Sequence, residues 1–153
     1  MALTKILIAV KTYPAISSKY EEIVCTAGFR EDGTWIRIYP IQFRQRAYDE
    51  QYKKYDWIEL DLIKNDSDFR SESYRPSTID SEIKIVKHLD TKHNWEERKK
   101  YILQNVYSDL TELINDAHNK TLRTSLAVFK PKRILDFTIE SVDREWNKTK
   151  IAK

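Results

Sequence analysis

Hydrophobic residues occur in short runs along the chain, and most of these runs alternate with polar positions, which is typical of β-strands. A continuous apolar run at 5–11, KILIAVK, predicts a buried strand, and the run at 23–27 predicts a second one. Strict alternation at 57–63, WIELDLI, predicts a strand with one exposed face. A further strand is expected at 82–89, EIKIVKHL.

The stretch 34–44, TWIRIYPIQFR, predicts a strand that starts after a tight turn at 31–33. Glycine adopts positive φ without steric cost, so Gly33 favours a hairpin between this strand and the 23–27 strand. Alternation assigns the side chains to two faces: Thr34, Ile36 and Ile38 on one, and Trp35, Arg37 and Tyr39 on the other. The first face belongs in a core, whereas the second presents a guanidinium between two aromatic rings.

The second half of the chain predicts two helices among further strands. Asn94 and Glu97 have the spacing of a capping pair for a helix that runs to about Gln104, and Ser108 is expected to cap a second helix that ends near Asn119. Two late strands are expected at 125–129 and 134–139.

Strands that mostly follow one another, without regular alternation with helices, indicate an α+β fold. We expect a mixed or antiparallel sheet, able to close into a small PUA-like barrel, with an inserted helical hairpin. A length of 153 residues suits a single domain, 1–153, that ends in a charged tail at about 141–153. Within this tail, a helix is expected to begin near Trp146. The polar stretch 65–78, NDSDFRSESYRPST, is expected to be a long loop of functional importance.

Composition narrows the classes of function. Two glycines in the whole chain, neither in a phosphate-loop context, argue against a Gly-rich nucleotide site. The net charge of +3 is compatible with an anionic partner without being that of a general DNA coat protein. A single cysteine and an N-terminal apolar run too short to span a membrane lead us to expect a cytoplasmic protein with no membrane partner.

Candidate ligand-binding side chains are cationic and aromatic, a combination that suits phosphate contact and base stacking. They are Trp35, Arg37, Tyr39, Arg44, Arg70, Glu72, Tyr74 and Arg75. Nearby carboxylates almost cancel the positive charge of this region. The alternative to a ligand-binding surface is therefore a solvated face whose charged side chains form salt bridges with one another. Lys130 to Arg133, KPKR, adds a compact basic turn.

Catalytic residues remain unassigned by the sequence, and we expect neither a metal nor a cofactor. His88, Asp90 and His93 match no zinc spacing. Cys25 lies in an apolar run and is expected to be structural. Glu59 and Asp61 share one face of a strand. They provide the alternative to a site without metal, because two carboxylates on one face could form a metal-dependent hydrolytic centre.

Several phrases occur together in the first half of the chain: VKTYP at 10–14, YEEIVCTAG at 20–28, WIRIYPIQFR at 35–44, KYDWIELDL at 54–62 and SDFRSESYRP at 67–76. In these the chain resembles an uncharacterised bacterial protein family. The resemblance attaches no activity and transfers no catalytic residue. At the level of architecture alone, a small barrel with helices is similar to PUA-like and ASCH-like domains, which commonly bind RNA or modified bases in DNA and include a few small hydrolases.

Three functions follow as hypotheses. The first is a small nucleic-acid-binding module for DNA or RNA, with a base held in a pocket of arginine and aromatic residues. The second is a small hydrolase of nucleotides or nucleic acid. The third is a protein-interaction domain, with a homodimer through the Trp35 face as one form of it.

Overall fold

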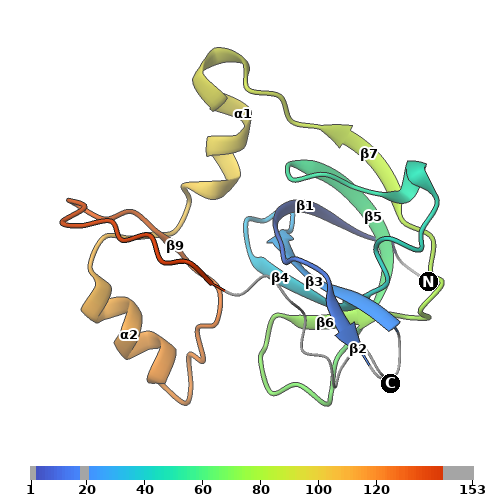
Figure 1. The fold of residues 1–153 in the computed structure, drawn as a ribbon, viewed down its shortest axis with the longest axis horizontal. Coiled ribbons are helices and arrows are strands. Elements are labelled where there is room, and N and C mark those ends of the chain that lie inside the picture. Colours follow the sequence, from blue (N-terminus) through green and yellow to red (C-terminus); the bar gives the residue numbers. More distant parts are fainter. Residues whose placement is uncertain (1–2, 18–20, 143–153) are drawn as a thin grey trace.

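A closed barrel of five strands forms the body of the protein (Figure 1). The computed structural model describes residues 3–17 and 21–142. In barrel order the strands are β1 (Leu3–Lys11), β3 (Glu21–Phe29), β4 (Trp35–Ile41), β6 (Ser73–Pro76) and β5 (Asp56–Lys64), and β5 pairs back onto β1. Only the β4–β6 pairing in this ring is parallel. The expectation of a mixed sheet closed into a small barrel with helices is confirmed.

Three further elements lie next to the ring of barrel strands. Strand β2 (Ala15–Ser17) pairs with β3, and β7 (Lys84–His88) pairs with β5. A short 3₁₀ turn, η1 (Tyr48–Glu50), lies in the connection between β4 and β5.

The middle of β1, residues 6–9, is buried on both faces, which explains why its sequence is continuously apolar there. Ile6 and Ile8 point into the barrel and pack with fully buried residues of the other strands. Leu7 points outward into a second cluster with Trp57 and Leu89, against which Tyr101 of α1 (Lys92–Ile102) packs.

The predicted hairpin is confirmed. Phe29 of β3 pairs with Trp35 of β4, and Gly33 in the connecting turn has φ 80. Ile36 and Ile38 are fully buried inside the barrel, as their alternation predicted. Trp35 lies on the outer face, half-buried, with its ring 4.1 Å from that of Phe29.

The polar stretch 65–78 is not only a loop, because residues 73–76 form β6. Ser73 and Tyr74 pair with β4, while Tyr74, Arg75 and Pro76 pair with β5. Strand β6 therefore completes the ring between β4 and β5. Its polar sequence concealed it, although Ser73 and Pro76 are buried.

Both helix starts differ from the prediction. Asn94 does not cap α1: the helix is preceded by Thr91, and Asn94 itself has φ 55. Asp109, not Ser108, caps α2 (Leu110–His118), since its carboxylate accepts from the backbone N–H groups of Thr111 and Glu112. A carboxylate beside the positive end of a helix is the more favourable cap.

The helices do not form a hairpin inserted between barrel strands. Both follow all five barrel strands, and β8 (Val106–Tyr107) separates α1 from α2. After α2, β9 (Val128–Phe129) pairs in parallel with β8 in a separate two-stranded sheet. Of the predicted strand at 125–129, only these last two residues are a strand.

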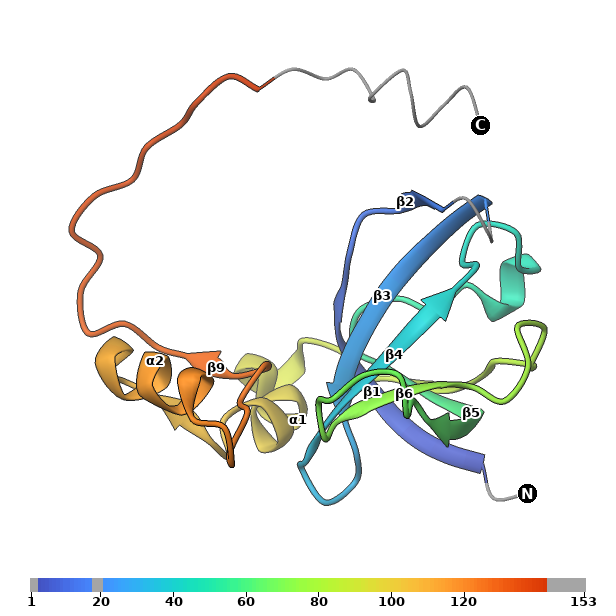
Figure 2. The same cartoon turned by 90° about the horizontal axis from the view of Figure 1, so that it is seen from below.

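No strand forms at 134–139. Ile134 and Phe137 are 76% and 81% exposed, and Figure 2 shows this segment leaving the body of the protein in an arc. The five barrel strands each have two neighbours in the ring, and the segment does not pair with β2, β7 or the β8–β9 sheet either. The expected tail at about 141–153 lies outside the described residues beyond position 142, as does the helix expected near Trp146.

Within the described part of the chain, no helix is long and apolar enough to span a membrane.

Candidate nucleic-acid interface

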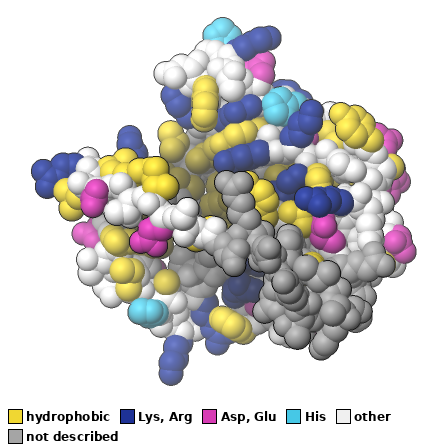
Figure 3. Space-filling view, in the orientation of Figure 1, with side chains coloured by type: hydrophobic (Ala, Val, Ile, Leu, Met, Phe, Trp, Pro, Cys, Tyr) yellow, Lys and Arg dark blue, Asp and Glu magenta, His cyan; other side chains and the backbone are white. Residues whose placement is uncertain are grey.

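Two adjoining cavities separate one end of the barrel from the segment that follows α2. One has a volume of about 390 Å³ and the other about 500 Å³, and Arg123, Thr124 and Ser125 lie in the walls of both. We call the two together the Arg123 cleft. Figure 3 shows Lys and Arg side chains beside hydrophobic ones at the hollow between the α2 region and the barrel.

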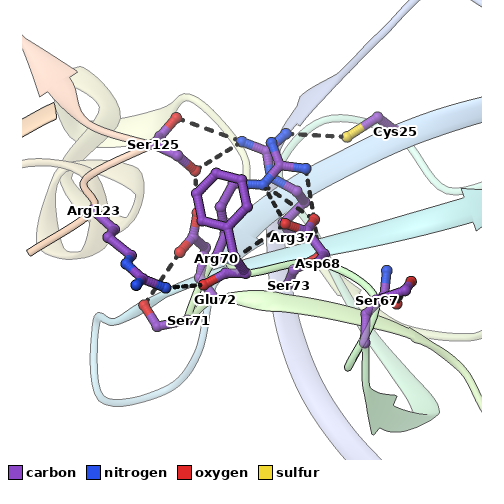
Figure 4. Close-up of polar contacts among 12 residues, drawn as sticks. Cys25, Arg37, Ser67, Asp68, Arg70, Ser71, Glu72, Ser73, Arg123 and Ser125 are labelled. Atoms are coloured by element: carbon purple, nitrogen blue, oxygen red, sulfur yellow. Dashed lines mark hydrogen bonds and ion pairs between the residues drawn. The ribbon is translucent and has the colours of Figure 1, made fainter. Parts of the chain in front are cut away.

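Arg37 ties the two walls of the Arg123 cleft together. From the outer face of β4, its guanidinium donates to Ser125 Oγ at 3.1 Å and approaches Cys25 Sγ at 3.5 Å (Figure 4). The Ser125 hydroxyl in turn donates to the Glu72 carboxylate. The Arg37 Nε is buried and has no hydrogen-bond partner within the described residues. Arg37 therefore holds Ser125 in position beside Glu72 through this hydrogen bond.

An ion pair shapes the loop that supplies the barrel side of the cleft. Arg70 donates to Asp68 through Nε at 2.8 Å and through a terminal nitrogen at 2.6 Å, and Ser73 Oγ donates to the same carboxylate at 2.7 Å. The hydrogen bonds from Arg70 hold the pKa of Asp68 well below its usual range. This geometry fixes the loop and aligns Arg70 along the cavity wall.

The charged side chains that line the smaller cavity are all basic: Arg70, Lys120 and Arg123. Arg123 donates to the carbonyl oxygens of Lys120 at 2.7 Å and Phe69 at 3.2 Å. Neither Lys120 nor Arg123 forms an ion pair with a carboxylate within the described residues. These two uncompensated cations stand beside the Phe69 ring, which is 74% exposed.

Arg123 also holds an unusual backbone conformation, with φ 50. For a residue other than glycine this conformation costs about 1 kcal/mol or more. Strained residues of this kind concentrate at functional sites.

Four of the sequence-predicted site residues, Trp35, Arg37, Arg70 and Glu72, meet at the Arg123 cleft. The other four do not line it. Arg44 pairs with Glu22 at 3.2 Å beyond the other end of β4, and Tyr39 is exposed on the outer face of that strand. Arg75 is exposed on β6. Arg30 and Lys64 lie 4.8 and 5.0 Å from the Tyr74 ring, so that ring is already covered by cations.

The wall that follows α2 was missed from the sequence, although the chain carries a signal there. Between Asp116 and Asp136 no acidic residue occurs, while five basic residues do: Lys120, Arg123, Lys130, Lys132 and Arg133. Only the KPKR turn was singled out from the sequence, and so Lys120 and Arg123, which line the cleft, were missed. Phe69 is an isolated aromatic residue in the polar stretch 65–78, and no sequence pattern indicates that it lines a cavity.

The other candidate chemistry is dispersed. His88 does not meet Asp90 and His93 in a ligand set; its Nδ1 lies 2.6 Å from Asp56. Glu59 pairs with Lys84 at 3.5 Å. No group of three or more His, Cys, Asp and Glu residues within the described ranges is arranged to hold a metal ion.

Comparison with known proteins places the barrel in a family. A family model described as a domain of unknown function (DUF8758) matches residues 2–104, more than half of the chain. The chain belongs to this family. No curated protein and no solved structure matches it. The DUF8758 region contains every barrel strand and α1, and so it supplies the Arg37 and Glu72 side of the Arg123 cleft. Lys120 and Arg123 lie beyond the matched residues.

Proposed function

We propose that the protein is a small nucleic-acid-binding module and that the Arg123 cleft receives the phosphate backbone. The observation that carries this proposal is the smaller cavity, whose charged lining is entirely basic and includes two cations with no carboxylate partner in the described chain. Lys120 and Arg123 would contact phosphate oxygens, since guanidinium and ammonium groups supply the usual phosphate donors. Arg70 would assist from its ion pair with Asp68.

Aromatic rings beside these cations suit a single strand better than a duplex. Phe69 is largely exposed next to Arg123, and Trp35 lines the larger cavity with Arg30. Unpaired bases stack on such rings with little dependence on sequence. The proposed likeness of the barrel to PUA-like and ASCH-like domains is an argument from architecture that points the same way.

Fluorescence anisotropy of labelled single-stranded and double-stranded DNA and RNA, at low and moderate salt, tests the proposal. We expect saturable binding that weakens as salt rises, with single strands preferred. Arg123→Gln and Lys120→Gln should each weaken binding and lower the salt slope by about 0.7 for a single strand. Arg37→Ala should also weaken binding, because Ser125 loses its anchor.

Lys87→Gln is the matched control, because Lys87 is exposed on β7 and lines neither cavity of the cleft. An equal loss in Lys87→Gln and Arg123→Gln would show that binding depends only on overall charge. Absence of saturable binding to any of the four probes would reject the module.

Hydrolysis and protein interaction remain hypotheses with less support. Glu59, one of the residues predicted as base or metal ligand beside Asp61 and Glu72, is paired with Lys84, and the described residues hold no cluster suited to a metal. The Trp35 ring packs on Phe29 on the outer face of the barrel, which leaves less of it for a homodimer contact.

A further inference from the structure

A second region of the barrel, away from the Arg123 cleft, contains a cavity of about 640 Å³, larger than either cavity of the cleft. It opens beside η1, between the end of β1 and the start of β5. A neighbouring cavity of about 330 Å³ shares Lys11, Phe43 and Gln51 with it. Volumes in this range suit small-molecule sites. None of the residues in either wall belongs to the Arg123 cleft.

Lys11 stands between the two cavities with donors to spare. Its ammonium lies 3.4 Å from the centroid of the Phe43 ring and 5.4 Å from that of Tyr52. It donates to the Tyr52 carbonyl oxygen at 3.3 Å and forms no ion pair within the described chain. An ammonium has three N–H donors, so an incoming acceptor oxygen can be bound without displacing a carboxylate.

The aromatic walls around Lys11 are partly held in place. Tyr52 is fully buried, and its hydroxyl lies 2.5 Å from the buried Thr26 hydroxyl. The Phe43 ring packs edge-on against Tyr52, with centroids 5.0 Å apart. Tyr48, at the rim of the larger cavity, is 87% exposed and offers a free ring face. A planar ligand can therefore enter against preformed aromatic surface.

The two carboxylates of the larger cavity differ in availability. Asp56 is occupied, because one oxygen accepts from the Lys53 N–H at 2.6 Å and the other lies 2.6 Å from His88 Nδ1. Asp49 is exposed and has no hydrogen-bond or ion-pair partner among the described residues. The cavity therefore presents a spare donor cation and a spare acceptor anion beside aromatic rings.

From this combination we propose that the cavity binds a nucleobase with a lactam edge, such as hypoxanthine, guanine or uracil. A lactam presents a carbonyl acceptor next to an N–H donor on one planar ring. The carbonyl would accept from Lys11 and the N–H would donate to Asp49, while the exposed Tyr48 ring contacts one face of the base. Adenine lacks this edge and presents an amino group where hypoxanthine has the carbonyl.

Titration of the full chain with inosine and with adenosine tests the proposal, read by calorimetry or NMR chemical shifts. These nucleosides carry no phosphate group, so neither of them can bind to the cations of the Arg123 cleft through phosphate contacts. We expect inosine to bind about tenfold more tightly than adenosine, because a hydrogen bond to a charged group is at stake. Lys11→Met should abolish the difference, and Lys99→Met, an exposed lysine of α1, should preserve it.

Asp49→Asn is a second variant at an exposed position, where no hydrogen bond or ion pair with another described residue is lost, and it should also weaken inosine binding. Equal affinity for both nucleosides, unchanged inosine affinity in folded Lys11→Met, or no saturable binding by the wild type would each overturn the proposal.

A free nucleoside and an unpaired base within a strand share the same lactam chemistry. Two single-stranded oligonucleotides that differ only by inosine or adenine at one central position distinguish these sources. An inosine preference in the oligonucleotides as well as in the nucleosides identifies a base presented by a strand, whereas a preference confined to the nucleosides identifies a free ligand. The nucleoside titration does not depend on the Arg123 cleft, so failure of strand binding leaves its result intact.

Discussion

Ser125 receives a hydrogen bond from Arg37, which lies 88 residues earlier in the chain. This pair shows how the role of a residue depends on what it contacts. The sequence leads us to expect that Arg37 meets a ligand with its flanking aromatic rings, and in the structure its guanidinium contacts Ser125 and Cys25 on the outside of the barrel. Lys120 and Arg123 form no ion pair with a carboxylate among the described residues, and they lie in a part of the sequence that has no acidic residue between Asp116 and Asp136.

Lys11 gives a prediction about stability at the scale of the residue. Partial burial of its ammonium lowers the pKa of Lys11, and the charge of Asp56 only partly opposes this shift. The unfolded chain, with a pKa near 10.5, holds the proton more firmly than the folded one. Stability therefore rises with pH between the lowered folded value and 10.5, and the protonated lysine costs stability below that window.

We accordingly expect Lys11→Met to be more stable than the wild type at pH 7, by no more than about 1 kcal/mol because solvent reaches the ammonium. This advantage should shrink as pH approaches 10.5. Urea unfolding at several pH values measures it, with Lys99→Met as the control for loss of an exposed charge. A Met variant less stable than the wild type at pH 7 would show that the contacts of Lys11 with Tyr52 and Phe43 outweigh its burial.

At the scale of the element, α2 depends on one side chain at its start. The Asp109 carboxylate accepts from two backbone N–H groups of the first turn, which lowers the pKa of Asp109. Because α2 has only nine residues and none of them is buried, capping contributes a large share of its local stability.

Asp109→Ala should therefore destabilise α2, because two backbone N–H groups of its first turn lose their acceptor. Native-state hydrogen exchange of amides in residues 110–118 measures this local effect. Ser108→Ala is the matched control, since Ser108 precedes the cap and should change little. Faster exchange in both variants to the same extent would mean that Asp109 has no special role.

For the whole molecule, the distribution of buried residues separates two parts. Every residue that the structure describes as buried lies between positions 6 and 98, inside the DUF8758 match at 2–104. The segment after residue 104 meets the barrel through polar contacts such as those of Ser125 with Arg37 and Glu72.

A chain ending at residue 104 should therefore fold into the same barrel and unfold cooperatively, because its hydrophobic core is complete. It should lose most of its affinity for nucleic acid, since Lys120 and Arg123 are absent. Circular dichroism during thermal unfolding tests the first expectation, and fluorescence anisotropy tests the second. A folded 1–104 chain that keeps full affinity would relocate binding to the barrel.

The strands with regular patterns, the hairpin at Gly33 and the faces of β4 can be predicted from local sequence, because side-chain alternation and turn preference act over a few residues. The pairing of the strands depends on the complete fold, and so does β6: its polar residues become a strand because β4 and β5 lie on either side of them. The same holds for the Arg123 cleft, whose two walls come from distant parts of the chain. Long-range pairing and the segregation of charge depend on the closed barrel, which no local pattern encodes.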